Sequence, residues 1–165
     1  MPASHPPQVP VTLRRGESRD AETIAAFNRA MALETEALVL QADRSLQGAQ
    51  RLLRDPGLGF YLVAERAGEV AGSLMVTFEW SDWRNGHFWW IQSVYVRPEA
   101  RRQGVFRALY RAVAQMVEQD ASVCGLRLYV EASNARAQAT YASLGMHRTH
   151  YLVYEQERPG ADFFG

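Results

Sequence analysis

The chain has 165 residues, with 18 cationic and 18 acidic side chains, and every one of its cations is an arginine. With 47% hydrophobic and 22% charged residues, it is expected to fold as a globular protein rather than to be disordered. The absence of net charge disfavours a nucleic-acid binder whose affinity depends on neutralising phosphates. The single cysteine excludes an internal disulfide and a zinc-binding cysteine cluster.

The length fits one domain, which we place at residues 11–154. Residues 1–10, with four prolines, are expected to be a flexible arm, and residues 155–165 a short tail. The opening residues lack the pattern of a secretory leader, and no apolar run approaches the roughly 20 residues that span a bilayer. We therefore expect a cytoplasmic protein without membrane association.

The first half of the domain predicts two helices followed by strands. A short strand over residues 11–14 precedes a helix that Asp20 caps, in which the apolar residues Ile24, Phe27 and Met31 are spaced three and four apart. A second helix covers residues 45–54 before the breaker Asp55-Pro56-Gly57. Apolar residues then alternate, which indicates strands at residues 60–65, 70–80 and 88–96. Asn85-Gly86 favours a hairpin between the last two of these strands.

The second half predicts helices and strands in alternation. Val105, Leu109, Val113 and Met116 form the apolar stripe of a long helix. A strand at residues 126–130, a helix at residues 134–144 and a final strand at residues 147–154 follow. The order β α α β β β α β α β predicts a mixed α/β domain.

The segment of residues 94–111 has the pattern of an anion site. A strand ends at Pro98, an arginine-rich turn contains Gly104, and a helix begins, so that free amides and the positive end of the helix dipole can meet a pyrophosphate. A tight turn with solvated arginines is the alternative, and from physical chemistry alone the two interpretations are about even. Neither a Walker loop nor a dinucleotide-binding glycine motif is present, which disfavours ATP and NAD.

Two spaced motifs nevertheless resemble those of the GNAT superfamily of N-acetyltransferases. The first, Arg101-Arg102-Gln103-Gly104-Val105-Phe106, is similar to its acyl-CoA motif but has Phe106 where the family usually has Gly or Ala. The second combines Asn134, Ala137, Tyr141 and Gly145-Met146. The resemblance covers roughly residues 11–154. It implies a GNAT fold: a mixed, mostly antiparallel sheet of six to seven strands, splayed between strands 4 and 5 and flanked by four helices.

The resemblance also implies acetyl-CoA as co-substrate. The amides of residues 102–107 would bind its pyrophosphate, the backbone of Val94 and Val96 would pair with its pantetheine, and Asn134 and Tyr141 would approach the thioester. The full set expected at the cofactor is Val94, Tyr95, Val96, Arg101, Arg102, Gln103, Gly104, Val105, Phe106, Arg107, Asn134, Ala137 and Tyr141. Tyr141 is the expected general acid for the departing thiolate. A core tyrosine bonded to backbone is the alternative.

The acceptor side is less determined. The stretch FEWSDWRNGHFWWIQSVYV resembles spermidine/spermine-type N-acetyltransferases, but Gln92 stands where those enzymes have a glutamate, and glutamine cannot act as a base. Glu34 and Glu79 are the preferred catalytic carboxylates, and Glu34 is also expected to bind substrate. Glu36, Asp82 and Glu131 are further candidates, and a solvated surface role is the alternative for each of the five.

Four tryptophans lie within residues 80–90. Trp80 and Trp83, together with Gln92, are predicted to contact a cationic or aromatic amine, with hairpin core or a dimer surface as the alternative. The histidines have no metal-ligand spacing, so no metal is expected.

The resemblance implies transfer of acetyl from acetyl-CoA to a primary amine, and the aromatic loop and the acidic first helix favour a small cationic or aromatic one. A protein or peptide amino group is the alternative acceptor, and a CoA-binding regulatory module without transfer is the alternative function. Because dimers are common in the resembling family, a homodimer is expected, with the aromatic hairpin as a candidate self-complementary patch. Residues 97–111 hold five arginines and one glutamate, while residues 17–36 hold five acids and two arginines. The neutral total therefore combines a basic turn suited to phosphates with an acidic segment suited to a cationic amine.

Overall fold

The protein is described by a computed structural model that covers residues 10–160. Its elements in chain order are β1 (Thr12–Arg15), η1 (Ser18–Asp20), α1 (Ala21–Glu36), α2 (Ala42–Arg54), β2 (Gly59–Arg66), β3 (Glu69–Ser81), β4 (Gly86–Val96), η2 (Pro98–Ala100), α3 (Val105–Gln119), β5 (Val123–Leu128) and α4 (Ala135–Ser143). The predicted order of helices and strands is confirmed as far as α4. Within residues 10–160, no helix has the length and apolar character needed to cross a bilayer.

One mixed sheet organises the fold, with its strands in the order β1-β2-β3-β4-β5. The pairs from β1 to β4 are antiparallel, and β4 pairs with β5 in parallel. A parallel pair needs a crossover connection, which α3 provides. The predicted mixed, mostly antiparallel sheet with four helices is confirmed, although the expected six to seven strands are five in the described part of the chain.

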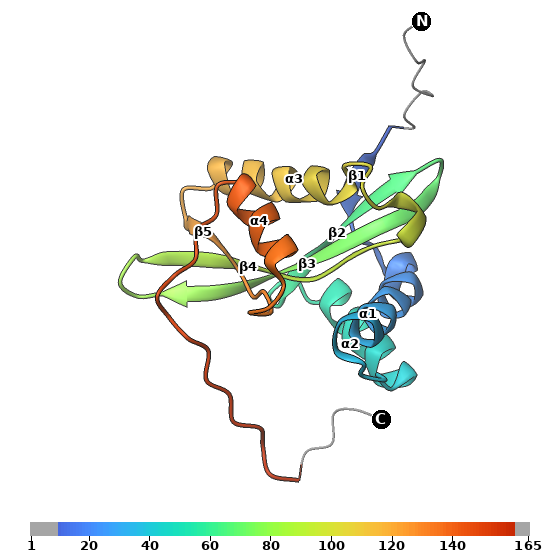
Figure 1. Ribbon diagram of the computed structural model, residues 1–165, viewed down its shortest axis with the longest axis horizontal. Helices are drawn as coiled ribbons and strands as arrows, with labels where there is room; N and C mark the ends of the chain where they lie inside the picture. The colour runs from blue at the N-terminus through green and yellow to red at the C-terminus, as the bar shows by residue number, and fades with distance from the viewer. Residues whose placement is uncertain (1–9, 161–165) are drawn as a thin grey trace, which may run out of the picture.

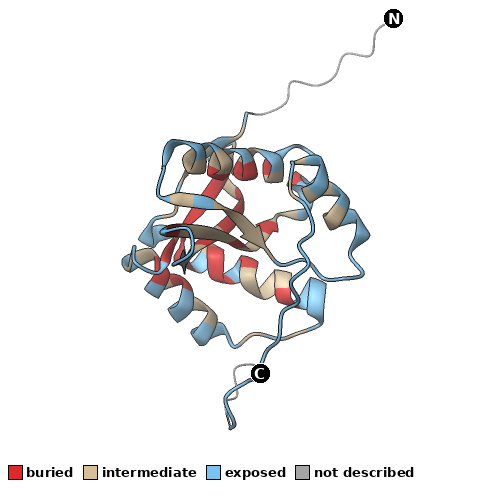
Figure 2. Ribbon diagram, turned by 90° about the vertical axis from the view of Figure 1, so that its left-hand side faces the viewer, coloured by how far each residue is buried: buried red, intermediate tan, exposed pale blue. Residues whose placement is uncertain are grey.

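Helices cover both faces of this sheet (Figure 1). On one face, α3 buries Val105, Leu109 and Val113 in a core that includes Leu74 and Ile91. On the other face, α1 and α2 bury a second core, in which Ile24, Ala25, Ala49 and Leu52 pack with Tyr61 and Val63 of β2. Figure 2 shows these buried residues between the helices and the sheet, and exposed residues on the outer helix surfaces. The apolar stripes predicted for α1 and α3 thus face the sheet.

The strands β4 and β5 stop pairing about halfway along β4. Their pairing extends from His87 to Ile91 of β4, so residues 92–96 have no strand neighbour on that side within the described part of the chain. A bulge accompanies this change: Met75 pairs with Gln92 and Ser73 with Tyr95, and Ser93 has a positive φ of 48°. The bulge adds a residue to β4 and bends it, as bulges do. The predicted splay between the fourth and fifth strands is therefore present, and it exposes the backbone edge of residues 92–96.

The predicted strand at residues 147–154 is wrong. This segment, which we call the terminal segment, forms neither helix nor strand and makes no backbone hydrogen bond to the rest of residues 10–160. It runs away from α4 and the sheet (Figure 1), and Tyr151 and Tyr154 are 68% and 89% exposed. Alternating apolar residues become a strand only when a sheet edge pairs with them. Of the expected arm and tail, residues 1–9 and 161–165 lie outside the described residues.

Candidate functional site

The N-terminus of α3 presents free backbone amides beside arginines. Gly104 precedes the helix with a φ of 81°, a conformation that favours glycine, and no side chain caps the helix. The first amides of an α-helix have no intrahelical acceptor, so those of residues 105–107 are available to a ligand. Arg102 has a φ of 61°, and its side chain and that of Arg107 are exposed. Free donors and positive charge at a helix N-terminus fit a pyrophosphate.

Two other side chains of this turn are engaged within the protein. Gln103 donates from Nε2 to the carbonyl of Glu99 at 2.6 Å and accepts from Arg66. Arg101 donates from Nε to the carbonyl of Val96 at 2.9 Å, which ties the turn to the end of β4. These bonds fix the path of the turn, so that the amides, rather than the Gln103 side chain, are the ready donors.

The end of β4 borders the same region. Val94 and Val96 turn their side chains toward the α3 core, whereas Tyr95 turns to the opposite face and packs on Phe27 with ring centroids 4.9 Å apart. The bulge explains why Tyr95 faces α1, because it shifts the alternation of the strand by one residue. The free backbone edge of this part of β4 has the geometry required to pair with an extended amide chain such as pantetheine.

Tyr141 approaches this region from α4. It is half-buried, and its ring packs edge-on against Phe106 in the first turn of α3, with centroids 5.9 Å apart. Burial raises the pKa of the Tyr141 hydroxyl, which therefore stays protonated at neutral pH. Phe106 stands where the acyl-CoA motif usually has Gly or Ala, and its side chain positions the Tyr141 ring. Tyr141 is suited to donating a proton rather than to accepting one.

The start of α4 is set by Asn134, whose Oδ1 accepts a hydrogen bond from the amide of Ala137 at 3.0 Å. This N-cap confirms the predicted beginning of the helix. Asn134 itself is exposed and Ala137 is half-buried. Two of the predicted cofactor residues therefore act together in fixing the helix that carries Tyr141.

A polar cluster lies on the sheet face that α1 and α2 share. Glu79 accepts a hydrogen bond from the indole of Trp90 and forms an ion pair with Arg127 of β5 at 2.8 Å. The Arg127 guanidinium carbon lies 3.7 Å from the centroid of the Phe88 ring, a cation–π contact. Burial alone would raise the pKa of Glu79, but the bonds from Trp90 and Arg127 outweigh it and lower the pKa. Glu79 is therefore an ionised carboxylate and a weak proton acceptor.

Gln92 belongs to the same face. It donates from Nε2 to the hydroxyl of Thr77 at 2.7 Å, across the β3–β4 pair and just before the bulge. The alternation of β3 and β4 places Thr77, Glu79, Phe88, Trp90 and Gln92 together. The structure thus brings two predicted acceptor-side residues, Glu79 and Gln92, onto one surface that leads to the splay.

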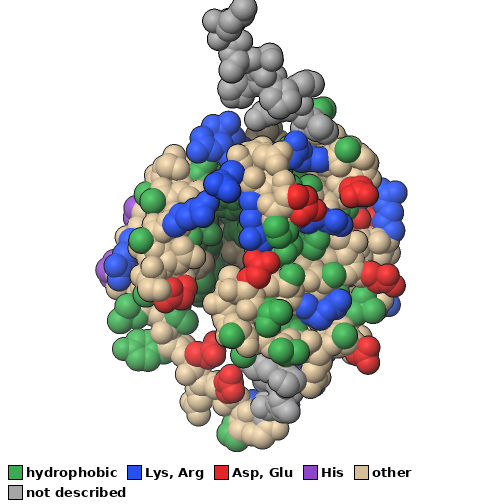
Figure 3. Space-filling view, turned by 45° about the vertical axis from the view of Figure 1, so that its right-hand side comes forward, with side chains coloured by type: hydrophobic (Ala, Val, Ile, Leu, Met, Phe, Trp, Pro, Cys, Tyr) green, Lys and Arg blue, Asp and Glu red, His purple; other side chains and the backbone are tan. Residues whose placement is uncertain are grey.

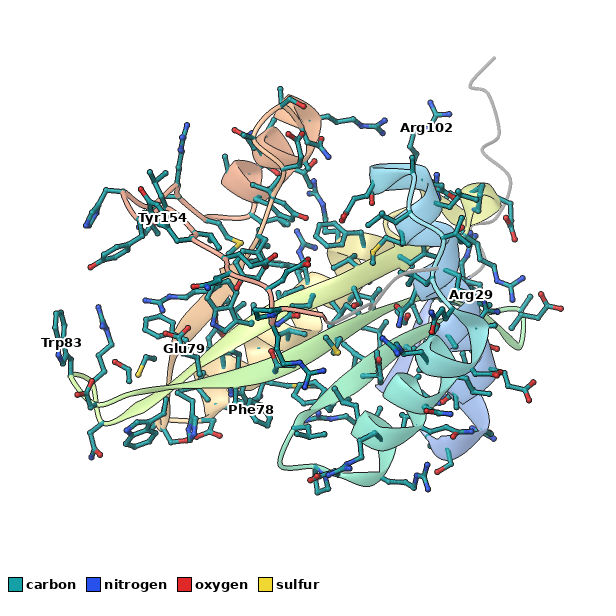
Figure 4. All side chains as sticks on the ribbon, turned by 90° about the horizontal axis from the view of Figure 1, so that it is seen from below. Arg29, Phe78, Glu79, Trp83, Arg102 and Tyr154 are labelled. Carbon is teal, nitrogen blue, oxygen red and sulfur yellow. The ribbon has the colours of Figure 1, made fainter. Side chains whose placement is uncertain are left out.

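Two other predicted acceptor residues lie elsewhere. Trp80 is 56% exposed on the opposite, α3-side face of β3, where its ring contacts His87 at 5.0 Å. Trp83 is 86% exposed at the tip of the β3–β4 hairpin, far along the sheet from Arg102 (Figure 4). The structure therefore does not bring them together with Glu79. Glu34 lies near the end of α1, where it contacts Tyr95 and Arg101.

Sequence reasoning missed Arg127 and Trp90, which hold Glu79. Alternation along β3 and β4 could have placed Trp90 beside Glu79, since both point to the same face of the hairpin. Arg127 had no such signal, because β5 reaches β4 only after the α3 crossover. Figure 3 shows that one face of the molecule is hollowed and that arginine side chains gather along part of its rim. Among residues 10–160, no three His, Cys, Asp or Glu residues converge as metal ligands would.

Comparison with known proteins gives a consistent result. The model of the acetyltransferase (GNAT) family matches residues 22–146. The chain is 34% identical over 148 residues to the thialysine N-epsilon-acetyltransferase of Bos taurus, which covers 82% of this chain and 83% of that protein. The fold of the present chain superimposes on that of a possible acetyltransferase from Clostridium difficile 630 with a TM-score of 0.85. The two sequences are 43% identical, and the match covers 90% of this chain and 97% of the other.

A more distant structure shares the fold alone. It is the aminoglycoside N-acetyltransferase AAC(6')-Iy in complex with CoA, with a TM-score of 0.73 and 15% identity over 94% of this chain and 99% of the other. The splayed sheet, the open N-terminus of α3 and the two motifs agree with the family match over most of the domain. The chain therefore belongs to the GNAT family of acetyltransferases.

Proposed function

We propose that the protein transfers an acetyl group from acetyl-CoA to a primary amine by direct attack. The observation that carries this proposal is the parting of β4 and β5 after Ile91, which opens a backbone edge between the N-terminus of α3 and Tyr141. The free amides of residues 105–107 and the exposed Arg102 fit the pyrophosphate. The edge at Val94–Val96 fits the pantetheine amides. The activated acetyl group is what the co-substrate supplies.

The chemistry then requires few groups. The neutral amine nitrogen attacks the thioester carbonyl, the carbon–sulfur bond breaks, and the sulfur takes the proton of the Tyr141 hydroxyl. The nitrogen loses one proton to water as the amide forms, and the Tyr141 oxygen regains a proton from water, which restores the enzyme. A backbone amide of β4 near Val94 polarises the carbonyl. Most of the acceleration comes from holding the two substrates together, with proton donation adding about 100- to 10,000-fold.

On the acceptor side, we assign Glu34 and Glu79 to the binding of a cationic amine. The lowered pKa of Glu79 keeps it ionised, but its ion pair with Arg127 balances the charge, so Glu79 offers the amine a hydrogen-bond acceptor rather than a net negative charge. Gln92 lies on the same face and offers an amide for orientation. Because Glu79 is a weak base, water near the splay completes deprotonation of the amine. Trp80 and Trp83 contact the substrate in this proposal only if it extends along the hairpin.

A small molecule with a side-chain amine is the proposed acceptor class. The support is the relative named for the ε-nitrogen of thialysine, which shares 34% identity with this chain. The half-buried ion pair of Glu79 with Arg127, flanked by Phe88, suits a compact polar substrate better than an extended apolar one.

The test measures CoA thiol release with acetyl-CoA against thialysine, a polyamine and a peptide with a free N-terminus. We expect turnover with the small amine. Tyr141→Phe keeps the ring contact with Phe106 and should lower kcat by about 100-fold or more while leaving the Kd of acetyl-CoA unchanged. Full activity of this variant would remove Tyr141 from the mechanism. Tight acetyl-CoA binding without turnover on any acceptor would favour the regulatory module.

We also propose that the protein is a cytoplasmic homodimer. The outer edge of β5 has no strand partner among residues 10–160, and unpaired edges attract further strands. The terminal segment offers four exposed large apolar residues in succession, Tyr151, Leu152, Val153 and Tyr154. Because it extends away from its own sheet (Figure 1), the proposed partner is the β5 edge of a second copy, in a symmetric exchange.

A further inference from the structure

Glu34 connects α1 to the end of β4 and to the turn before α3. One of its carboxylate oxygens accepts a hydrogen bond from the Tyr95 hydroxyl at 3.2 Å, and the other pairs with Nη2 of Arg101 at 2.7 Å. The Arg101 guanidinium carbon also lies 5.4 Å from the centroid of the Tyr95 ring. Both of the carboxylate oxygens are thus occupied.

The ion pair between Glu34 and Arg101 is weak enough for Arg101 to exchange Glu34 for another anion. The side chains of Arg101 and Glu34 are each 42% exposed, and exposed ion pairs are usually of low net strength. Tyr95 is buried and packs on Phe27, so it holds the carboxylate in place whether or not Arg101 is bound. The contact with Arg101 is therefore the part of the network that can change.

Both members of the pair have a second role in the proposed reaction. Arg101 begins the basic turn whose neighbours face the CoA pyrophosphate, and a phosphate oxygen competes well for a guanidinium. Glu34 carries a negative charge on the acceptor side, but its charge is balanced while Arg101 is bound to it. The single positive charge of Arg101 balances Glu34 in the contact seen here, so a phosphate that draws the guanidinium toward itself weakens the pairing with Glu34.

We propose that Arg101 is a shared ligand that passes from Glu34 to a CoA phosphate when the co-substrate binds. The contact that breaks joins Nη2 of Arg101 to the carboxylate, and the contact that forms joins an Nη nitrogen of the same guanidinium to a phosphate oxygen. The bond from Nε to the Val96 carbonyl is kept, so the turn does not move. Glu34, still held by Tyr95, then presents an unbalanced charge to the cationic amine. Acetyl-CoA thus prepares the acceptor site, and by linkage the amine strengthens the binding of acetyl-CoA.

This inference rests on the proposed function, but its test needs no acceptor. The Kd of CoA is measured by calorimetry at low salt for the wild type, Glu34→Gln, Arg101→Gln and the double variant. Glu34→Gln should tighten CoA binding by about two- to fivefold, since the phosphate no longer competes with the carboxylate. Arg101→Gln should weaken it by a similar factor. In the Arg101→Gln background, Glu34→Gln should have no effect.

Two matched variants separate this exchange from simpler effects. Glu36→Gln removes a charge from the same helix end, and Arg102→Gln removes one from the same turn. We expect Glu36→Gln to leave the Kd unchanged, and Glu34→Gln to keep its full effect when combined with Arg102→Gln. Tightening by Glu34→Gln that persists without Arg101 would show only long-range repulsion and would overturn the proposal. Absence of CoA binding in the wild type would instead refute the proposed function.

Discussion

Asp20 is the last residue of η1 and immediately precedes α1, but its side chain does not cap that helix as predicted. Its contacts instead provide the sharpest test of how this fold is held together. Its side chain is only 5% exposed and forms a bidentate pair with Arg14 of β1, with bonds of 2.7 and 2.9 Å. It also accepts the backbone amide of Glu17 at 2.7 Å. Asp20 therefore joins β1, the η1 turn and α1, and its burial makes each bond hard to replace with water.

Asp20→Asn keeps the size of the side chain but removes its charge and turns an amide NH₂ toward the guanidinium. Breaking a buried ion pair from one side costs about 3–5 kcal/mol, and we expect roughly 2–3 kcal/mol because Arg14 retains its pair with Glu65 at 2.6 Å. For a chain of this length that lowers Tm by roughly 5–10 °C. Glu22→Gln, in the exposed first turn of α1, should cost less than about 1 kcal/mol.

The pKa of Asp20 determines how the stability difference between wild type and Asp20→Asn depends on pH. Burial would raise this pKa, but the hydrogen bonds and charge of Arg14 outweigh it, so the pKa is lowered in the folded state. A lowered pKa means that the stabilisation is present above the unfolded value of about 3.9 and is lost as pH falls through the folded value. Urea unfolding should give a constant difference in the free energy of unfolding between wild type and Asp20→Asn from pH 8 to about 5. This difference should become smaller below about pH 4. A small difference in the free energy of unfolding at pH 7, or one that grows in acid, would refute this reasoning.

Two further predictions concern backbone packing and assembly. Gly59→Ala should destabilise the fold by roughly 2–4 kcal/mol in a denaturant titration, because a Cβ there would lie 2.0 Å from the carbonyl oxygen of Val76 and φ is +146°. As the control, Gly48→Ala in α2 has no atom within 4 Å of its added Cβ and should be neutral or stabilising in the same titration. For the dimer, light scattering should show two copies for the wild type and one for Tyr151→Ser/Val153→Ser; a dimeric variant, or a monomeric wild type, would contradict assembly through the terminal segment.

Much of the fold could be predicted from the sequence. Apolar periodicity located α1, α3 and the β3–β4 hairpin, because a side chain's face depends only on its position in a helix or strand. The N-cap role of Asn134 and the helix start at Gly104 are likewise local properties of a few consecutive residues. The two motifs indicated the family, which the family match confirms.

The partners of the charged groups could not be predicted in this way. That Arg127 pairs with Glu79, and Arg101 with Glu34, depends on contacts between segments 48 and 67 residues apart in the chain. The same limit explains the error at residues 147–154, where a strand-like pattern finds no partner in its own sheet. Up to α4, the sequence alone determined which segments become helices or strands and which faces they bury, since these follow from local geometry. Only the tertiary structure decided which charges meet, because each pairing requires a long loop to close.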